Sequence, residues 1–293
     1  MTDVSIIGLG SMGLTLADLL LKAGNSVSLW NRSAEKAADL VARGAHLHPT
    51  PALAISASPI TIICLYDYDA ARSILRSEGV AEALDDRLLV NLGTGSPKDA
   101  QEAGAFVAKS GGRYLDGAIQ AAPSQMGQPE TPVLISGARD SFDEGAPTLR
   151  ILGGNLIYLG ERIEAASFMD LATLSYVYGA YAGFLHGAML AEAVGINVGT
   201  YGNLVNDISP TFGAFFKNEG GVIESDDFTI TESPLRISIP AVERILTASR
   251  DLGLNTEVPE LVGSWLDRAE RAGLADQELA AMIKVIRPAA PRT

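Results

Sequence analysis

The residues nearest the start of the chain that could hold a charged ligand form a Gly-x-Gly-x-x-Gly pattern. The pattern stands between the apolar run 4–7 and the helix-forming stretch 14–23. Its glycines permit a tight turn, close approach of a pyrophosphate, and close packing of helix on strand, whereas the alternative is a merely structural turn. The helix N-terminus adds unpaired N–H groups and partial positive charge, which favour an anion. We therefore predict a dinucleotide-binding loop. Its expected contacts are Gly8, Leu9, Gly10, Ser11, Met12 and Gly13.

The end of the second apolar run, 27–30, carries polar side chains that discriminate between the two nicotinamide cofactors. An acid at this place would hold the ribose 2′-OH and repel a 2′-phosphate. The chain instead has Asn31, Arg32 and Ser33, with Lys36 one helical turn later. Arg32 offers a planar fork suited to phosphate, and its neighbours can donate hydrogen bonds. These residues predict NADPH rather than NADH. The alternative is a solvated turn that caps the next helix through Ser33.

Two further candidates for chemistry lie on a long apolar stretch in the second half. Residues 171–191 include no formally charged side chain, and Asp170 immediately precedes them. Tyr178 lies eight residues later, about 80° around a helix, so both side chains can border one cleft. A carboxyl group can donate a proton or stabilise a cation, and the sequence leaves both open. The alternatives are a carboxylate beside the helix dipole for Asp170 and plain packing for Tyr178.

Apolar runs alternate with helical stretches through the first half of the chain, and the strand signal nearly stops after Gly160. This alternation predicts an α/β fold with βαβ units and a mostly parallel sheet. We expect a cofactor-binding domain over 1–162 and a helical domain over 163–293. The predicted strands are 4–7, 27–30, 60–65, 88–92, 113–116, 133–136 and 156–159. The predicted helices are 14–23, 34–43, 69–76, 97–110, 171–191, 238–252 and 257–272.

Composition narrows the class of protein. The 293 residues carry a net charge of −13 and no basic run, so a nucleic-acid partner is not expected. The lone cysteine, Cys64, lies in an apolar run and excludes an internal disulfide. The three histidines lack partners at ligand spacing, so no metal is expected. The first strand starts at once, with no visible signal peptide, which favours the cytoplasm.

The apolar helix of 171–191 poses a burial problem. Its length and three glycines four residues apart (Gly179, Gly183 and Gly187) imitate a membrane-spanning dimerisation helix. Its tyrosines, threonine and histidine, and the lack of a second span, argue against a membrane. A domain of about 130 residues can hardly bury this helix alone. We therefore predict an intertwined homodimer in which a partner subunit covers it.

Three segments together resemble the β-hydroxyacid dehydrogenase superfamily, which includes 6-phosphogluconate dehydrogenase. They are the glycine loop with Arg32, the segment 116–127, and the segment 165–186. Those enzymes carry a catalytic lysine early in the long helix and an asparagine four residues later, where this chain has Asp170 and Leu174. Over almost its whole length the chain resembles a branch with that departure, the NADPH-dependent imine reductases.

This resemblance implies a Rossmann domain, a long interdomain helix and an all-α domain swapped around a partner in a homodimer. It implies reduction of cyclic imines to amines, with Asp170 as proton donor or iminium stabiliser and Tyr178 beside the substrate. Reductive aminases of this group usually carry asparagine where this chain has Thr94, which puts condensation of ketone with amine in doubt. The alternatives are an alcohol oxidoreductase with altered acid/base machinery and an NADP-binding protein without turnover.

The remaining expected site residues come from the loops and from an aromatic cluster. Leu65 and Thr94 are expected at the cofactor. Phe212, Phe215 and Phe216 precede an expected helix break at 220–221, and we expect them in the core, with a substrate pocket as the alternative. The expected pocket residues are Ala121, Pro123, Thr211 and Phe212.

Overall fold

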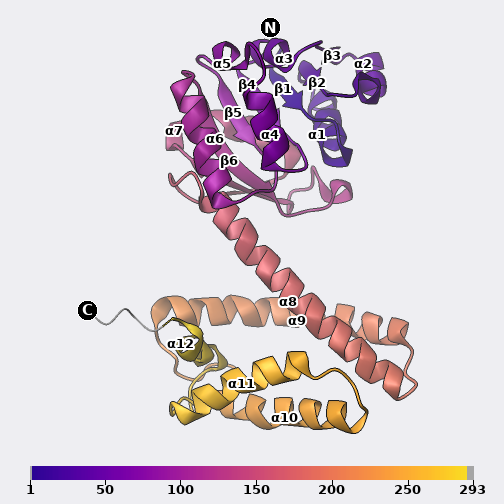
Figure 1. The fold of residues 1–293 in the computed structure, drawn as a ribbon, viewed down its shortest axis with the longest axis vertical. Coiled ribbons are helices and arrows are strands. Elements are labelled where there is room, and N and C mark those ends of the chain that lie inside the picture. Colours follow the sequence, from indigo (N-terminus) through magenta and orange to yellow (C-terminus); the bar gives the residue numbers. More distant parts are fainter. Residues whose placement is uncertain (1, 289–293) are drawn as a thin grey trace. The chain divides into compact units, whose positions relative to one another are not determined.

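A computed structural model describes residues 2–288 of the chain (Figure 1). Its residues fall into two compact units, which divide between Ser175 and Tyr176. Helix α8 (Ala165–Ala193) contributes residues to both.

The first unit is built on one eight-stranded sheet with the order β3-β2-β1-β4-β5-β6-β7-β8. All neighbouring strands run parallel except β6 and β7, which are antiparallel. The first six positions follow the 3-2-1-4-5-6 order of a doubly wound dinucleotide-binding fold. The strands are β1 (Val4–Ile7), β2 (Val27–Trp30), β3 (His46–Leu47), β4 (Ile60–Ile63), β5 (Leu88–Asn91), β6 (Arg113–Ile119), β7 (Pro132–Gly137) and β8 (Asn155–Tyr158).

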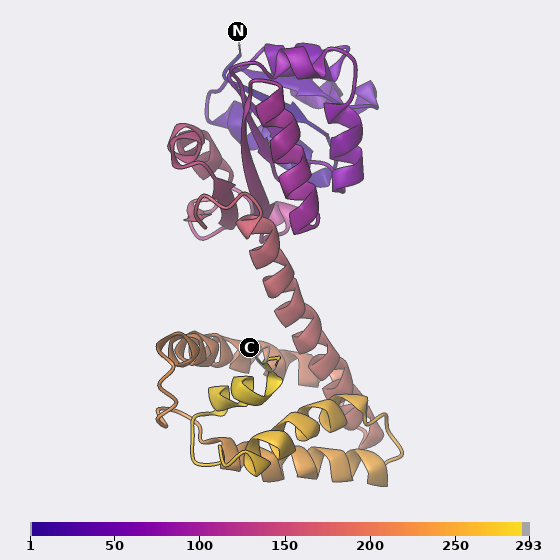
Figure 2. The ribbon, with the colours of Figure 1, turned by 60° about the vertical axis from the view of Figure 1, so that its left-hand side comes forward.

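Helices cover both faces of this sheet (Figure 2). Successive residues of a strand point to opposite faces, so Ile6 packs in one core cluster and Ile7 in the other. Because both faces are buried, the central strands are continuous apolar runs. Helices α1 and α7 contribute to the first cluster and α3 to α6 to the second. The helices are α1 (Ser11–Lys22), η1 (Ala34–Ala37), α2 (Ala38–Ala42), α3 (Pro51–Ser56), α4 (Tyr68–Leu75), α5 (Val80–Ala83), α6 (Pro97–Lys109), η2 (Pro123–Gln125) and α7 (Arg139–Leu152).

The predicted α/β class and parallel sheet are confirmed, and each of the seven predicted strands is present. Their ends differ: β4 stops at Ile63, two residues early, whereas β6 continues to Ile119, three residues beyond its expected end. The short strand His46–Leu47 was not predicted, because two exposed residues carry no apolar pattern. The continuation of β6 matters most, because it brings the residues after Asp116 to the edge of the sheet.

Helix α8 starts six residues before the apolar stretch that predicted it, and a strand residue fixes that start. Ser136 on β7 accepts a hydrogen bond from the Ala166 N–H at 2.9 Å and donates one to the Ile163 carbonyl at 2.8 Å. Both Ser136 and Ala166 are fully buried. The serine supplies a partner for an N–H group in the first turn, where helices lack internal acceptors.

The named elements of the second unit within the described residues are all helices, and an isolated β-bridge joins Pro234 to Glu278. Its cores are small and gather around the last helices, with Leu235 and Leu266 fully or almost fully buried. In addition to its part of α8, it includes α9 (Val198–Ser225), α10 (Leu235–Asp251), α11 (Glu257–Arg271), η3 (Leu279–Met282) and α12 (Ile283–Ile286).

Two expectations for this unit are wrong. Helix α9 runs through Gly220 and Gly221 to Ser225 without the expected break. Each glycine in a helix interior costs only about 1 kcal/mol relative to alanine, so two of them need not end the helix. The aromatic cluster is not core in this chain: Phe212 and Phe216 remain about half exposed. These rings contact one another and Tyr176, whose ring centroid lies 5.6 Å from that of Phe216.

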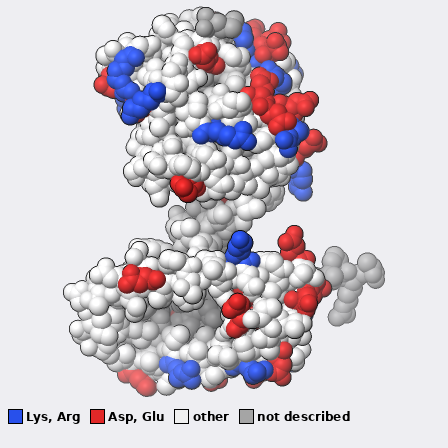
Figure 3. All heavy atoms as spheres, turned by 180° about the vertical axis from the view of Figure 1, so that it is seen from behind, with Lys and Arg blue, Asp and Glu red and all other residues white. Residues whose placement is uncertain are grey.

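The surface of the described residues carries mixed charge. On the face drawn in Figure 3, basic and acidic side chains stand singly or in mixed groups between wide uncharged areas. No helix within residues 2–288 is both long and apolar enough to cross a membrane. Within the same residues, no three His, Cys, Asp or Glu side chains gather as a metal site would require.

Candidate active site

The glycine loop adopts a conformation that only glycine allows at two of its three positions. Gly8 has φ +101°, and a Cβ there would collide with the carbonyl oxygen of Cys64. A Cβ on Gly13 would collide with the Gly8 carbonyl oxygen. By contrast, a Cβ on Gly10 would have no heavy atom within 4 Å. The first and third glycines are therefore required by packing, whereas the middle one leaves open space in which a ligand can reach the backbone.

The N-terminus of α1 suits an anion. Gly10 occupies the N-cap position and offers no side chain, and the first turn includes no acidic residue. Ser11 and Met12 begin the helix, where N–H groups lack intrahelical acceptors. The arrangement agrees with the dinucleotide loop expected from the sequence.

Asn31 supports this loop from the end of β2. Its Oδ1 accepts the Leu9 N–H at 3.0 Å, and its Nδ2 donates to the Ser33 carbonyl at 2.9 Å. The amide therefore holds loop backbone on both sides. Ser33 is the N-cap residue of η1, but its side chain makes no capping hydrogen bond. Arg32 is exposed and is left available for a ligand, as far as residues 2–288 show.

The loops after β4 and β5 lie next to the glycine loop. Leu65 Cδ2 is 2.7 Å from the place of a Cβ on Gly8, and the Leu65 carbonyl is 3.2 Å from that on Gly93. Leu65 thus stands between the glycine loop and the loop that carries Thr94, which is exposed. Asn91 at the end of β5 accepts the Gly93 N–H at 3.0 Å and fixes the second loop. The expected cofactor contacts of the first unit therefore share one edge of the sheet. Lys36 lies on η1 and is exposed.

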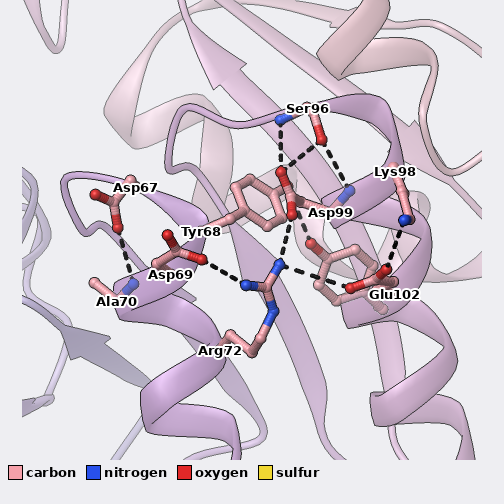
Figure 4. Close-up of polar contacts among 10 residues, drawn as sticks. Asp67, Tyr68, Asp69, Ala70, Arg72, Ser96, Lys98, Asp99 and Glu102 are labelled. Atoms are coloured by element: carbon pink, nitrogen blue, oxygen red, sulfur yellow. Dashed lines mark hydrogen bonds and ion pairs between the residues drawn. The ribbon is translucent and has the colours of Figure 1, made fainter.

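Ion pairs join α4 to the start of α6, the helix that follows the loop 92–96 (Figure 4). Arg72 on α4 contacts Asp99 at 2.6 Å and Glu102 at 3.6 Å, both on α6. Asp99 also completes a capping box with Ser96, which ends the loop. The cavity beside these residues has a volume of about 50 Å³, so it is far too small for a dinucleotide.

A buried carboxyl group, Asp116, lies in the middle of β6. It accepts hydrogen bonds from the hydroxyls of Tyr68, Tyr114 and Ser167, the last at 2.6 Å. Burial raises its pKa to about 6, although the three hydroxyl groups oppose that shift. Because Ser167 lies in the first turn of α8, Asp116 joins this helix to the sheet. Burial likewise raises the pKa of Tyr68 far above its usual range.

Asp170 lies in the second turn of α8 and is 7% exposed. Its Oδ1 accepts a hydrogen bond from Gln120 Nε2 at 2.6 Å. The Oε1 of Gln120 is 2.7 Å from the hydroxyl of Thr173, one turn further along the helix. Helix α8 begins five residues before Asp170, so the carboxyl group lies beyond the first turn. The helix dipole acts most strongly within that first turn and therefore affects Asp170 less.

The expected substrate-pocket residues divide between the units. Ala121 follows Gln120 and lines an open cavity of about 340 Å³, and Pro123 begins the short helix η2. Tyr178, Thr211 and Phe212 belong to the second unit. Tyr178 is 68% exposed on α8.

Sequence reasoning missed the residues that hold Asp170 in place, namely Gln120, Thr173 and the buried cluster around Asp116. One signal was present: Asp116 is the only charged residue in the strand after Arg113, in an otherwise apolar run. Gln120, at the end of that strand, carried no signal by itself, because its partners lie about fifty residues later.

Comparisons with protein families divide the chain in two. Residues 3–160 match the model of the NAD binding domain of 6-phosphogluconate dehydrogenase. Residues 163–288 match the model of the C-terminal domain of NADPH-dependent reductive aminase-like proteins. Together the two models cover nearly the whole chain.

Individual proteins agree with these matches. An NADPH-dependent reductive aminase of Aspergillus oryzae is 31% identical over 285 residues, 96% of each chain. An imine reductase from Myxococcus stipitatus, solved with NADP⁺, has a TM-score of 0.88 at 28% identity and covers 97% of this chain and 100% of its own. A reductive aminase from Aspergillus terreus, solved with NADPH and ethyl levulinate, has a TM-score of 0.87 at 33% identity, covering 98% and 100%.

The glycine loop yields a matched pair of variants. Gly13→Ala should lower the free energy of unfolding by more than about 2 kcal/mol, because its methyl group meets backbone. Gly10→Ala should leave the thermal midpoint nearly unchanged but weaken dinucleotide binding at least about tenfold. Thermal unfolding and cofactor titration measure the two effects. Equal losses of stability in both variants would contradict the assignment of open space to Gly10.

Proposed function

Because the chain belongs to the family of NADPH-dependent imine reductases and reductive aminases, we propose that it reduces the C=N bond of small imines to amines. The observation that carries this proposal is Asp170, which Gln120 holds at the end of β6. The resemblance to the β-hydroxyacid dehydrogenases puts Asp170 at the position of their catalytic lysine. A carboxyl group suits a nitrogen that must finish protonated. Cyclic imines such as 1-pyrrolines are the proposed substrates.

We propose that residues at one edge of the sheet bind NADPH. When bound, NADPH supplies the hydride that reduces the imine carbon. The loop 8–13 and the α1 terminus bind its pyrophosphate through backbone N–H groups. Arg32, with Ser33 and Lys36, binds the 2′-phosphate, while Asn31 holds the loop in place. Leu65 and Thr94 border the nicotinamide end.

We propose a reducing compartment, the cytoplasm, for this protein. Its sequence has a single cysteine, Cys64, which cannot form an internal disulfide. Cell fractionation tests this location.

Asp170 acts on the substrate nitrogen in one of two ways. As an acid, it donates its proton when the hydride reaches carbon, and solvent later restores that proton. As a carboxylate, it stabilises the cationic iminium by its charge. Tyr178, eight residues along the same helix, is proposed to contact the substrate.

A permanently charged substrate distinguishes these two actions. NADPH oxidation should occur with 2-methyl-1-pyrroline, and Asp170→Asn should lower its kcat by at least about a hundredfold without changing NADPH affinity. An N-methylated pyrrolinium needs no proton. If Asp170→Asn reduces this substrate as fast as the wild type does, Asp170 is a proton donor. If Asp170→Asn loses as much kcat on this substrate as on 2-methyl-1-pyrroline, Asp170 acts by its charge. Absence of imine turnover, together with NADP⁺ reduction by 3-hydroxyisobutyrate, would contradict the proposed function.

Arg32 should determine preference for NADPH. Arg32→Ala should weaken NADPH binding by about tenfold or more and leave NADH binding within about twofold, because only NADPH carries the 2′-phosphate. Lys22→Ala, an exposed basic residue paired with Asp18, is the control for loss of one positive charge. Titration of both cofactors measures the ratio, and parallel weakening of the two would refute the role of Arg32.

A homodimer is part of the proposed function. Within the second unit, the apolar side chains of Val177, Tyr178 and Leu204 are more than half exposed. A Cβ on Gly179 or Gly183 would meet nothing within 4 Å, which leaves room for another helix. Apolar surface of this extent on two long helices supports a second copy of the chain as its cover, intertwined around α8.

Sedimentation equilibrium tests the dimer. The chain should sediment at twice its mass, and Leu204→Glu should shift it toward the monomer because a charge would enter the apolar interface. Leu53→Glu, at a leucine 51% exposed on α3 of the first unit, should leave the mass unchanged. A monomer at the highest concentration, with no effect of Leu204→Glu, would refute the dimer.

A further inference from the structure

We propose that Gln120 is a positioning residue that fixes the orientation of the Asp170 carboxyl group, and that Thr173 in turn orients Gln120. The inference rests on the proposed function in assigning Asp170 to the substrate nitrogen. It adds which oxygen acts: Gln120 occupies Oδ1, so Oδ2 is the oxygen left for the substrate.

The backbone around Gln120 is held rigidly. Gln120 directly follows β6, and its own N–H donates to the Pro132 carbonyl of β7 at 3.1 Å, continuing the antiparallel pairing. Its side chain extends to Asp170 across a separation of fifty residues, with Nε2 and Oδ1 2.6 Å apart. A residue at the end of β6 is thus hydrogen-bonded to the second turn of α8.

Thr173 contacts the oxygen end of the Gln120 amide. Its Oγ1 lies 2.7 Å from Gln120 Oε1 and 2.8 Å from the Asp170 carbonyl oxygen. The hydroxyl carries one proton for these two acceptors, and the contact with Oε1, the shorter of the two, accommodates the amide with its oxygen toward Thr173. With its oxygen engaged in this way, the amide presents Nε2 to Asp170.

Reversal of the amide is disfavoured at the Asp170 end. It would place Oε1 against an ionised Asp170 at the same short distance, with no donor between the two oxygens. Asp170 is almost completely buried, so the low local dielectric increases both the attraction of the present arrangement and the repulsion of the reversed one. The three side chains therefore have one mutually consistent orientation when Asp170 is charged.

The first arm of the test measures steady-state kinetics of imine reduction. Gln120→Met preserves length but removes donor and acceptor, and should lower kcat about tenfold with NADPH affinity unchanged. Gln101→Met, an exposed glutamine on α6, is the matched control and should behave as wild type. Thr173→Val should lower kcat about threefold, and Thr173→Ser, which keeps the hydroxyl, should recover most of that loss.

A double-variant cycle separates positioning from a general effect on structure. If Gln120 acts only through Asp170, then Gln120→Met in an Asp170→Asn background should change kcat by less than about twofold, although it changes the parent about tenfold. A full tenfold loss in both backgrounds, or wild-type kcat in the single variant, would overturn the inference.

A spectroscopic arm keeps the inference testable without turnover. The side-chain amide resonance of Gln120, assigned by its loss in Gln120→Met, should move in Asp170→Asn and Thr173→Val but stay in Thr173→Ser. If the wild type reduces no imine yet this resonance behaves as described, the proposed function fails and the orienting contacts stand. If imine turnover is normal and the resonance ignores both partners, the inference fails and the proposed function stands.

Discussion

The attachment of α8 to strands β6 and β7 is the constraint on which the candidate site depends. Ser136 of β7 fixes the backbone at the helix start, Asp116 of β6 binds the hydroxyl of Ser167, and Gln120 holds Asp170. These contacts come from strands that are packed on both faces and cannot shift independently of the sheet. The carboxyl group on the helix is therefore placed by the sheet, through a residue that lies fifty positions earlier in the sequence.

Sheet topology brings that attachment to the same edge as the cofactor loops. Strands β1, β4, β5 and β6 run parallel, so their carboxyl ends face one way. Gly8 follows the first, Leu65 the second and Gln120 the last, with Thr94 after β5. The antiparallel β7 then closes against β6 and supports Gln120 through its backbone. One edge of the first unit thus carries both the dinucleotide loop and the anchor of Asp170.

The glycine loop alone does not distinguish reactions, because alcohol and imine chemistry both need the same cofactor geometry. What distinguishes them is the group beside the reacting bond. A lysine serves an alcohol oxidiser as acid and base, whereas a carboxyl group can protonate nitrogen or stabilise an iminium. Asp170, with Oδ1 bound by Gln120 and Oδ2 left free of that contact, fits the second chemistry.

Local patterns predicted much of this protein because they follow from local physics. The apolar runs predicted seven strands, the glycine spacing predicted the loop, and the uncharged stretch predicted α8, all through turn geometry and burial of neighbouring residues. The break at 220–221 was wrong, because helical packing on either side outweighs the weak intrinsic preference of two glycines.

The sequence by itself determined the α/β class and the dinucleotide loop, and its resemblance to the imine reductases selected Asp170 as the candidate for chemistry. Only the tertiary structure decided that Asn31 holds the loop, that Asp116 is buried among hydroxyl groups, and that Gln120 and Thr173 orient Asp170. The physical reason is separation along the chain. Such hydrogen bonds join residues 22 to 53 positions apart, and no local spacing encodes them until the sheet brings their elements together.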